Sequence, residues 1–386
     1  MTVPNGSHKT VPSRLFQIET PNLEDFKKIC SQTTDKSTYP LATSIDHNIP
    51  IYDARTLDLQ NTSLTTTLQD EWYHILSTGP GILVLKGMYD PTQYTETLNT
   101  TNRAFTSIIT RERASSTKKG DHFAASGKND RIWNSFSKHA LEDPSSFINY
   151  YSNPWLRLVS ETWLGPAYRV TAQVNVVKPG GAARTATAII ISASRICRPG
   201  AVAHSDMPLQ SGPTRFLPFS QTYEPGYLAW RREDFRAFFQ EKYVALPLEF
   251  GDGLFFNPAV FHAAGANETE PTPDGGFHRK ANLLQISSGL GKAMESIDVV
   301  PIVERCWGTL LERFKHAGEV DGGLENFVKA VADGYPFPTN LDKRPPAPNG
   351  MAPESEQDIM VRGLREGWGT ERAVEELRKM RADSWA

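Results

Sequence analysis

The sequence predicts a mostly β core with α-helices on both sides of it along the chain. Polar and apolar residues alternate through residues 168–179, which indicates a strand with one apolar face. Residues 251–287 have the pattern of a strand, a polar loop and a second strand. Apolar residues recur at helical spacing in residues 65–77 and 299–315, so helices should precede and follow these strands.

The composition excludes several classes of protein. The 386 residues, 39% of them hydrophobic, can bury a full core. A net charge of -3 gives no basic surface for nucleic acid or an anionic membrane. Cys30, Cys197 and Cys306 are scattered and odd in number, which argues against a disulfide framework and fits a reducing compartment. Because no segment has the pattern of a signal peptide or a membrane span, we expect a cytoplasmic protein.

Along the chain the predicted elements form three regions. Residues 1–50 are rich in serine, threonine and proline and should form an extended arm. Residues 51–298 should form the main domain, and residues 299–386 a helical extension that braces it or joins two subunits of a homodimer. Within these regions we expect a buried strand at 82–87 and helices at 22–31, 65–77, 91–110, 144–164, 299–315, 324–334 and 356–380.

A histidine and an arginine stand at the ends of the two strands predicted in residues 251–287. His262 comes at the end of the first strand, and small residues after it leave room beside the ring. Arg279 precedes the second strand. An imidazole can hold a metal ion, and a guanidinium can grip a carboxylate through two parallel hydrogen bonds. These side chains are therefore candidates for a metal ligand and an anion-binding group.

These residues give the sequence a resemblance to a known family. Residues 251–287, together with the segment Ser-Gly-Pro-Thr-Arg-Phe-Leu-Pro-Phe-Ser at 211–220, resemble the phytanoyl-CoA dioxygenase family of Fe(II)- and 2-oxoglutarate-dependent oxygenases, and most of all its fungal small-molecule members. The resemblance covers residues 79–288. It implies a jelly-roll barrel, the double-stranded β-helix, with helical flanks. It also implies that His262 binds iron and that Arg279 binds the far carboxylate of 2-oxoglutarate.

The resemblance also suggests roles for four further residues. The polar face of the strand at 168–179 carries Gln173 and Asn175. Inside a barrel they would lie near 2-oxoglutarate or substrate, whereas on an open sheet they would meet solvent. Arg131 and Trp133 end a segment, residues 119–133, that stands where family members close over the substrate. A plain surface loop is the alternative for that segment.

The iron motif that the family leads us to expect is missing from its place. The family supplies two ligands as His-x-Asp shortly after a strand that ends in Lys-Pro-Gly-Gly, which stands here at 178–181. Residues 182–200 contain no histidine and no acidic residue. One choice of codons for residues 183–195, translated from its third nucleotide, encodes Pro-His-Arg-Asp-Cys-His-His-His-Leu-Gly-Phe, which contains the motif. We therefore hypothesise a frame-shifted exon edge, which the sequence of the transcript would test.

One His-x-Asp does occur in the sequence, at His204 and Asp206. Apolar residues lead into it and a turn follows, as at a strand end where ligands can gather. Together with His262, these two residues are the candidate metal ligands. The alternative is a capped strand end, in which Asp206 accepts hydrogen bonds from nearby turn amides.

The function we expect is that of a dioxygenase that uses Fe(II), 2-oxoglutarate and O2 to oxidise a small molecule, an amino acid or an intermediate of secondary metabolism, with release of succinate and CO2. Two alternatives stay open. The disrupted motif at 183–195 fits a catalytically impaired family member, or a mis-spliced product, that keeps the barrel without iron. A cupin-like enzyme with another metal and no 2-oxoglutarate would leave Arg279 without a role.

Overall fold

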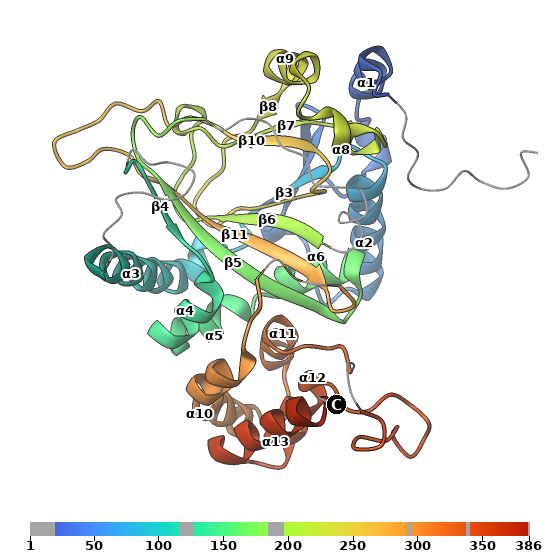
Figure 1. Ribbon diagram of the computed structural model, residues 1–386, viewed down its shortest axis with the longest axis vertical. Helices are drawn as coiled ribbons and strands as arrows, with labels where there is room; N and C mark the ends of the chain where they lie inside the picture. Colours follow the sequence, from blue (N-terminus) through green and yellow to red (C-terminus); the bar gives the residue numbers. More distant parts are fainter. Residues whose placement is uncertain are drawn as a thin grey trace, which may run out of the picture.

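The computed structural model describes residues 20–115, 127–183, 197–291, 293, 295–336 and 340–384. Its centre is a pair of β-sheets that face each other (Figure 1). The larger sheet has the strand order β1-β2-β3-β9-β6-β11-β5-β4, and the smaller has the order β10-β7-β8. The strands are β1 Ser44–Asp46, β2 Ile49–Asp53, β3 Ile82–Lys86, β4 Asn129–Ile132, β5 Tyr168–Val177, β6 Cys197–Ala203, β7 Thr214–Leu217, β8 Val244–Ala245, β9 Gly253–Phe256, β10 Phe261–Ala264 and β11 Arg279–Ser288.

Apolar side chains from both sheets fill the space between them. Phe216 of β7 packs with Leu254 and Phe256 of β9 and with Ala281 of β11 in one buried cluster. Partner residues on antiparallel strands point to the same side of a sheet, so the register of β11 shows which residues of β5 also face inward. The partners along these two strands are Arg279 with Val177, Ala281 with Asn175, Leu283 with Gln173 and Gln285 with Thr171.

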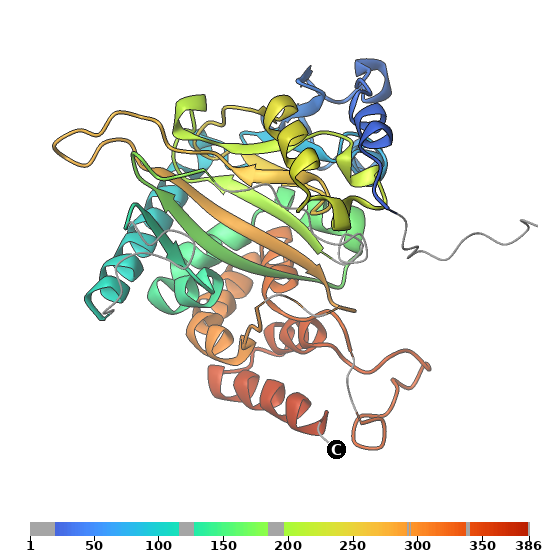
Figure 2. The same ribbon diagram turned by 45° about the horizontal axis from the view of Figure 1, so that its top comes forward.

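Helices lie on the outer side of the larger sheet (Figures 1 and 2). Val170 and Ala172, on the apolar face of β5, pack in one cluster with Trp72, Phe147 and Trp307 from these helices. The layer therefore buries the apolar face of β5 and leaves its polar face to the interior between the sheets. The helices that share in this layer are α2 Thr62–Ser77, α3 Pro91–Ser115, α4 Ser135–Glu142, α5 Pro144–Tyr151, α6 Pro154–Leu164, α10 Val299–Ala317 and α11 Gly322–Val331.

Three shorter helices cover the smaller sheet on its outer side (Figure 1). Phe26 of the first helix and Phe235 of the third pack with Phe261 of β10 in a separate cluster. Successive side chains of a strand point to opposite faces, so the residue after Phe261, His262, points into the interior. The three helices are α1 Leu23–Cys30, α8 Gly226–Ala229 and α9 Glu233–Lys242.

The C-terminal helices gather at one end of the molecule, at the bottom of Figure 1. They comprise α10, α11, α12 (Glu356–Arg365) and α13 (Thr370–Asp383). The indole Nε1 of Trp307 in α10 donates to the carbonyl of Trp368, between α12 and α13, at 2.8 Å. Their cluster is continuous with the one that covers β5, so the predicted extension packs against the main domain.

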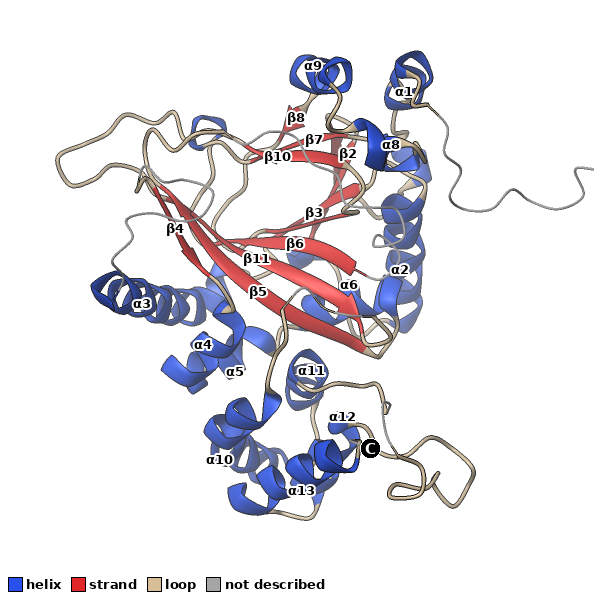
Figure 3. Cartoon of the chain, viewed as in Figure 1, coloured by secondary structure: helices blue, strands red, loops and turns tan. Residues whose placement is uncertain are grey.

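The predicted fold class is correct in its elements and wrong in their proportions. The helices expected at 22–31, 65–77 and 299–315 are present, as are the strands expected at 82–87 and 168–179. Within the described ranges, however, helices hold more residues than strands, so the protein is not mostly β (Figure 3). The reason is geometric, because strands of two to four residues form the smaller sheet, whereas α3 in the outer layer has 25 residues.

Several boundaries also differ from the predicted ones. The helix expected at 144–164 is divided into α5 and α6, because the backbone of Asn153, which precedes Pro154, is extended. The helix expected at 356–380 is divided into α12 and α13, because the chain turns at Gly367 with a φ of +66°. Strands β1 and β2 join the larger sheet, so sheet pairing begins before residue 50.

The division of the chain into domains at residues 50 and 298 stays a prediction. Within the described part of the chain, no helix is long and apolar enough to cross a membrane.

Candidate functional site

Three segments that are far apart in the sequence meet beside Arg279. Its Nη1 donates to the carbonyl of Ser211, before β7, at 3.2 Å and to that of Gly265, after β10, at 3.3 Å. Gly212 has a φ of +73°, and a Cβ on it would overlap the carbonyl oxygen of Ala266. Only glycine meets both conditions without strain. The segment at 211–220, the strand of His262 and the arginine, which the sequence indicates separately, therefore lie together.

His262 has a defined tautomer. Its Nδ1 lies 2.8 Å from the carbonyl oxygen of Val260, and because that oxygen only accepts, Nδ1 carries the proton and Nε2 the lone pair. Phe216 and Phe256 pack against the ring. Burial lowers the pKa of His262, which favours the neutral imidazole. A neutral ring whose Nδ1–H is held by a carbonyl is the form in which histidine binds metals.

Arg279 brings a buried positive charge to the same region. The residue is 6% exposed. The carbonyls of Ser211 and Gly265 accept hydrogen bonds from its guanidinium and orient it. A carboxylate bound beside it would receive charge-assisted hydrogen bonds in a setting with little competition from water. This environment fits the far carboxylate of 2-oxoglutarate.

The polar face of β5 turns inward and is buried. Gln173 is 4% and Asn175 is 8% exposed, so the solvent alternative does not apply to them. Nη1 of Arg131 donates to Oε1 of Gln173 at 2.8 Å. The Nε2 of Gln173 and the Nδ2 of Asn175 have no hydrogen-bond partner among the described residues. Buried amide nitrogens are normally paired, so these two donors can serve a bound molecule.

Arg131 and Trp133 lie at the surface, next to the inward polar face of β5. The guanidinium of Arg131 lies 5.2 Å from the centre of the Trp133 ring, at cation–π distance. Trp133 is 40% exposed. Of the segment predicted to close over the substrate, residues 119–126 lie outside the described residues. The side chains of Arg131 and Trp133 therefore lie between the interior and the surface.

His204 lies on the other side of the larger sheet from His262. Its neighbour Ala203 faces the interior cluster, so His204 turns toward the helices. There its Nε2 lies 2.9 Å from the hydroxyl of Tyr150, and its Nδ1 lies 3.0 Å from Oδ1 of Asn102. Burial lowers its pKa to about 3. Both ring nitrogens thus have partners within the protein.

Asp206 makes the contact that the capped-strand alternative expects. Its side chain is exposed, and Oδ1 accepts a hydrogen bond from the backbone amide of Phe250 at 2.9 Å. The structure therefore does not bring together His204, Asp206 and His262. As metal ligands, His204 and Asp206 stay predictions without support from this geometry.

The described residues fit 2-oxoglutarate better than they fit iron. Across the described ranges, no three histidine, cysteine, aspartate or glutamate side chains are grouped so that they could hold a metal. The segment at 183–195, on which the frame-shift hypothesis falls, lies outside the described residues from 184 onward. Residues 184–196 contain none of these four residue types. The chain thus offers Arg279 to a carboxylate and His262 to a metal, but its described part holds no complete set of iron ligands.

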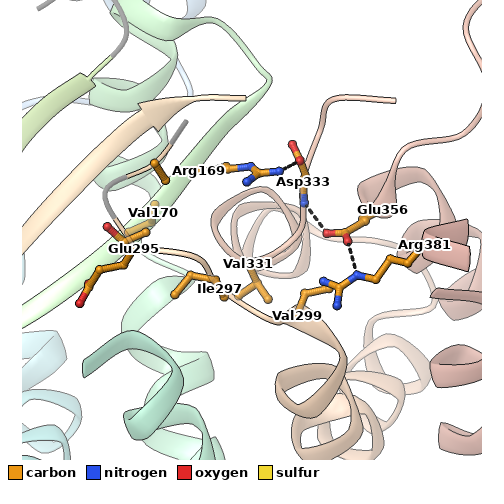
Figure 4. Close-up of a pocket in the computed structure, with 11 residues that line it drawn as sticks. Arg169, Val170, Glu295, Ile297, Val299, Val331, Asp333, Glu356 and Arg381 are labelled. Atoms are coloured by element: carbon orange, nitrogen blue, oxygen red, sulfur yellow. Dashed lines mark hydrogen bonds and ion pairs between the residues drawn. The ribbon is translucent and has the colours of Figure 1, made fainter. Parts of the chain in front are cut away.

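A pocket lies at the N-terminal end of β5, whereas Gln173 and Asn175 lie further along the strand (Figure 4). Arg169 and Thr171 of β5 line it together with Glu295 and with Asp333 and Glu356 from the C-terminal region. None of the predicted site residues is among its lining residues. The pocket therefore belongs to the junction between β5 and the C-terminal helices.

Backbone groups at the site could not be assigned from the sequence. The carbonyl of Val260 determines the tautomer of His262, and the carbonyls of Ser211 and Gly265 orient Arg279. Every residue has a carbonyl, so residue identity does not indicate which ones take part. The two glycines at 212 and 265 are the only indication, since close backbone contacts favour glycine.

Comparisons with known proteins give one family match and several similar structures. A family model described as "Phytanoyl-CoA dioxygenase (PhyH)" matches residues 78–272, half of the chain. No curated protein matches the sequence. Solved structures that resemble the chain include the non-heme alpha ketoglutarate dependent epimerase SnoN from nogalamycin biosynthesis, at 16% identity and a TM-score of 0.43, over 58% of this chain and 84% of that one. The carbocyclase SnoK from the same biosynthesis has 16% identity and a TM-score of 0.44, over 58% and 86%.

Proposed function

The chain belongs to the phytanoyl-CoA dioxygenase family of Fe- and 2-oxoglutarate-dependent oxygenases, and we propose that it oxidises a small molecule in the interior between its two sheets. The observation that carries the proposal is the meeting of Arg279 with the ends of the segments that bear His262 and residues 211–220. The substrate is an amino acid or an intermediate of secondary metabolism, as in the fungal small-molecule members that the sequence resembles.

Each residue of the site has a distinct role in this proposal. Arg279 binds the far carboxylate of 2-oxoglutarate, and Asn175, two positions from the partner of Arg279, donates to the same molecule. His262 provides its Nε2 to the metal. Arg131 and Trp133 contact the substrate at the edge of the interior. In this family iron and 2-oxoglutarate supply the oxidation, and succinate and CO2 are released.

A second candidate function follows from the incomplete ligand set of the described residues. The residues described supply one metal ligand, and residues 184–196 contain no further one. A chain with this sequence would keep the carboxylate site at Arg279 and bind 2-oxoglutarate without iron. Such a protein would be a catalytically impaired family member or the product of a mis-spliced transcript.

Replacing Arg279 with glutamine should weaken 2-oxoglutarate binding by about 10- to 100-fold, which is the effect of losing a charge-assisted hydrogen bond. Calorimetric titration of the metal-free full chain measures this dissociation constant. Arg236→Gln, in which an exposed arginine of α9 is changed, is the matched control and should leave the constant unchanged. Equal affinity of wild type and Arg279→Gln would overturn the proposed site.

An anaerobic titration with Fe(II) and 2-oxoglutarate separates the two candidate functions. A saturable visible charge-transfer band that is lost in His262→Ala means that the chain builds an iron site. Binding of 2-oxoglutarate without the band favours the impaired member, and the sequence of the transcript then decides whether residues 183–195 are as printed. A band that survives in His262→Ala excludes this histidine as a ligand.

A further inference from the structure

The amide of Gln173 has one allowed orientation in this structure. Arginine can only donate hydrogen bonds, so the group of Gln173 that faces Nη1 of Arg131 at 2.8 Å must be its oxygen. The usual ambiguity between the oxygen and nitrogen of a glutamine amide is therefore removed. Nε2 points away from Arg131 with two buried N–H groups that have no partner in the part of the chain that the structure describes.

The neighbours of Gln173 on the inner face cannot satisfy these donors. Its partner on β11 is Leu283, and the partner of Leu283 on β6 is Ala201. Neither side chain has a hydrogen-bond acceptor. Asn175, two residues along on the same face, also has a buried Nδ2 that no described residue pairs with. A strip of amide donors thus lies beside small apolar side chains, which is a suitable surface for a molecule that carries oxygen atoms.

We propose that Gln173 selects a substrate with an oxygen acceptor at this point, a carbonyl, hydroxyl or carboxylate, and that Arg131 is the positioning residue that holds its amide in the donating orientation. This inference rests on the proposed function, whose substrate it describes further. Trp133, at cation–π distance from Arg131, restricts the guanidinium in turn.

The distance from Arg279 assigns the acceptor to the substrate and not to 2-oxoglutarate. Leu283, the partner of Gln173, lies four residues beyond Arg279 on β11, about 13 Å along the strand. Asn175 pairs with Ala281, which lies about 7 Å from Arg279 along β11. The four carbon–carbon bonds of 2-oxoglutarate span about 6 Å at most. With one carboxylate at Arg279, 2-oxoglutarate can reach Asn175, and Gln173 is left for another molecule.

The test uses the full-length protein with 15N-labelled glutamine side chains and two probes of matched shape. The Nε2 resonances of Gln173 are assigned by their loss in Gln173→Glu. Cyclohexanone, which only accepts hydrogen bonds, should shift these resonances in a saturable way when 2-oxoglutarate is present. Cyclohexylamine, which is protonated near neutral pH and only donates, should not. The addition of 2-oxoglutarate alone should leave them unchanged.

Variants of Arg131 test its positioning role through the same resonances. Arg131→Lys keeps a donor near Oε1 of Gln173 and should retain the response to cyclohexanone. Arg131→Met removes the donor and should weaken the response at least five-fold, because the amide is then free to turn. Equal responses in both variants would show that Arg131 does not hold the amide.

Three other outcomes would overturn the proposal in different ways. A shift caused by 2-oxoglutarate alone would make it the source of the acceptor. Equal shifts with both probes would mean that the site does not require an acceptor, and no shift with either would mean that Gln173 faces no ligand.

If cyclohexanone shifts the resonances while 2-oxoglutarate binds nowhere, the proposed function fails and the amide site stands. If 2-oxoglutarate binds and cyclohexanone has no effect, the inference alone fails.

Discussion

The two histidines predicted as metal ligands differ in what their ring nitrogens contact. His262 has one nitrogen bound to a backbone carbonyl, whereas both nitrogens of His204 contact side chains of the protein. A third histidine, His139, is fully buried, and its Nε2 lies 2.8 Å from the hydroxyl of Ser146. Burial lowers the pKa of His139 to about 3. His139 and His204 therefore both contact side chains of the helix layer, whereas the Nε2 of His262 carries its lone pair on the side of the interior.

The depressed pKa values of His139 and His204 make the protein sensitive to acid. The unfolded chain binds a proton at each histidine below the ordinary pKa of 6.5, and the folded protein does so only near 3. Stability is thus complete above pH 6.5 and falls as the pH drops from 6.5 toward 3, by about 1.4 kcal/mol per pH unit for each histidine. In urea unfolding between pH 6 and 4, the free energy of unfolding of His139→Leu should fall less steeply with falling pH than that of the wild type, by the contribution of one histidine. An unchanged slope would contradict the burial argument.

At the scale of elements, the site depends on the loop before β7 touching the loop after β10. Gly212 lies in the left-handed region and its backbone is close to that of Gly265. The carbonyls of Ser211 and Gly265, one on each side of this contact, accept hydrogen bonds from the guanidinium of Arg279. The amide of Glu268 also donates to the carbonyl of Gln210 at 2.7 Å, which joins the same two loops. Two loops from the smaller sheet thus orient a side chain of the larger one.

The substitution Gly212→Ala should lower the free energy of unfolding by more than about 2 kcal/mol, because it adds a steric clash to the cost of a left-handed alanine. It should also weaken 2-oxoglutarate binding, since the loops that orient Arg279 must separate. Gly318→Ala is the matched control, because Gly318 has a φ of +76° at the end of α10 and a Cβ added there would have no atom of the described residues within 4 Å. It should cost about 1 kcal/mol. Equal costs in urea unfolding would mean that the loop contact is unimportant.

At the scale of the whole molecule, an ion network ties β5 to the C-terminal helices (Figure 4). Arg169, on the same strand as Gln173, pairs with Asp333. The amide of Asp333 donates to Glu356 at 3.0 Å, and Nε of Arg381 donates to Glu356 at 3.2 Å. Glu356 is 9% exposed, and burial raises its pKa. The strand that carries the inner polar residues is therefore held from outside by the extension.

The substitution Arg381→Met should lower the free energy of unfolding by about 1 to 2 kcal/mol near pH 7, since the buried carboxylate of Glu356 loses a cation while Arg381 itself is partly exposed. Arg381 stabilises only the ionised carboxylate, so this cost appears as Glu356 ionises in the folded protein, which its raised pKa places above 4.5, and it grows as the pH rises. The difference between variant and wild type should therefore shrink as the pH falls toward 4. Exposed Arg378→Met, on the same helix, should show no such pH-dependent difference.

The sequence by itself determined the chemistry-bearing residues and most of the elements. The alternation at 168–179 and the helical spacing at 65–77 reappear as β5 and α2, because these patterns reflect which face of an element is buried. His262, Arg279 and the segment at 211–220 are recognisable because their residue types suit the chemistry. The sequence also shows that residues 182–200 carry no histidine or acidic residue.

Only the tertiary structure decided which of these residues share a space. A shift of one residue along a strand reverses the face of a side chain, so His204 falls among the helices although its spacing to Asp206 resembles a ligand pair. The inward direction of Gln173 and Asn175 depends on the helix layer that covers the other face of β5. Contacts such as Arg131 with Gln173 and Arg279 with Ser211 join residues 42 and 68 positions apart. No local pattern encodes them, because they arise when the sheets and loops pack together.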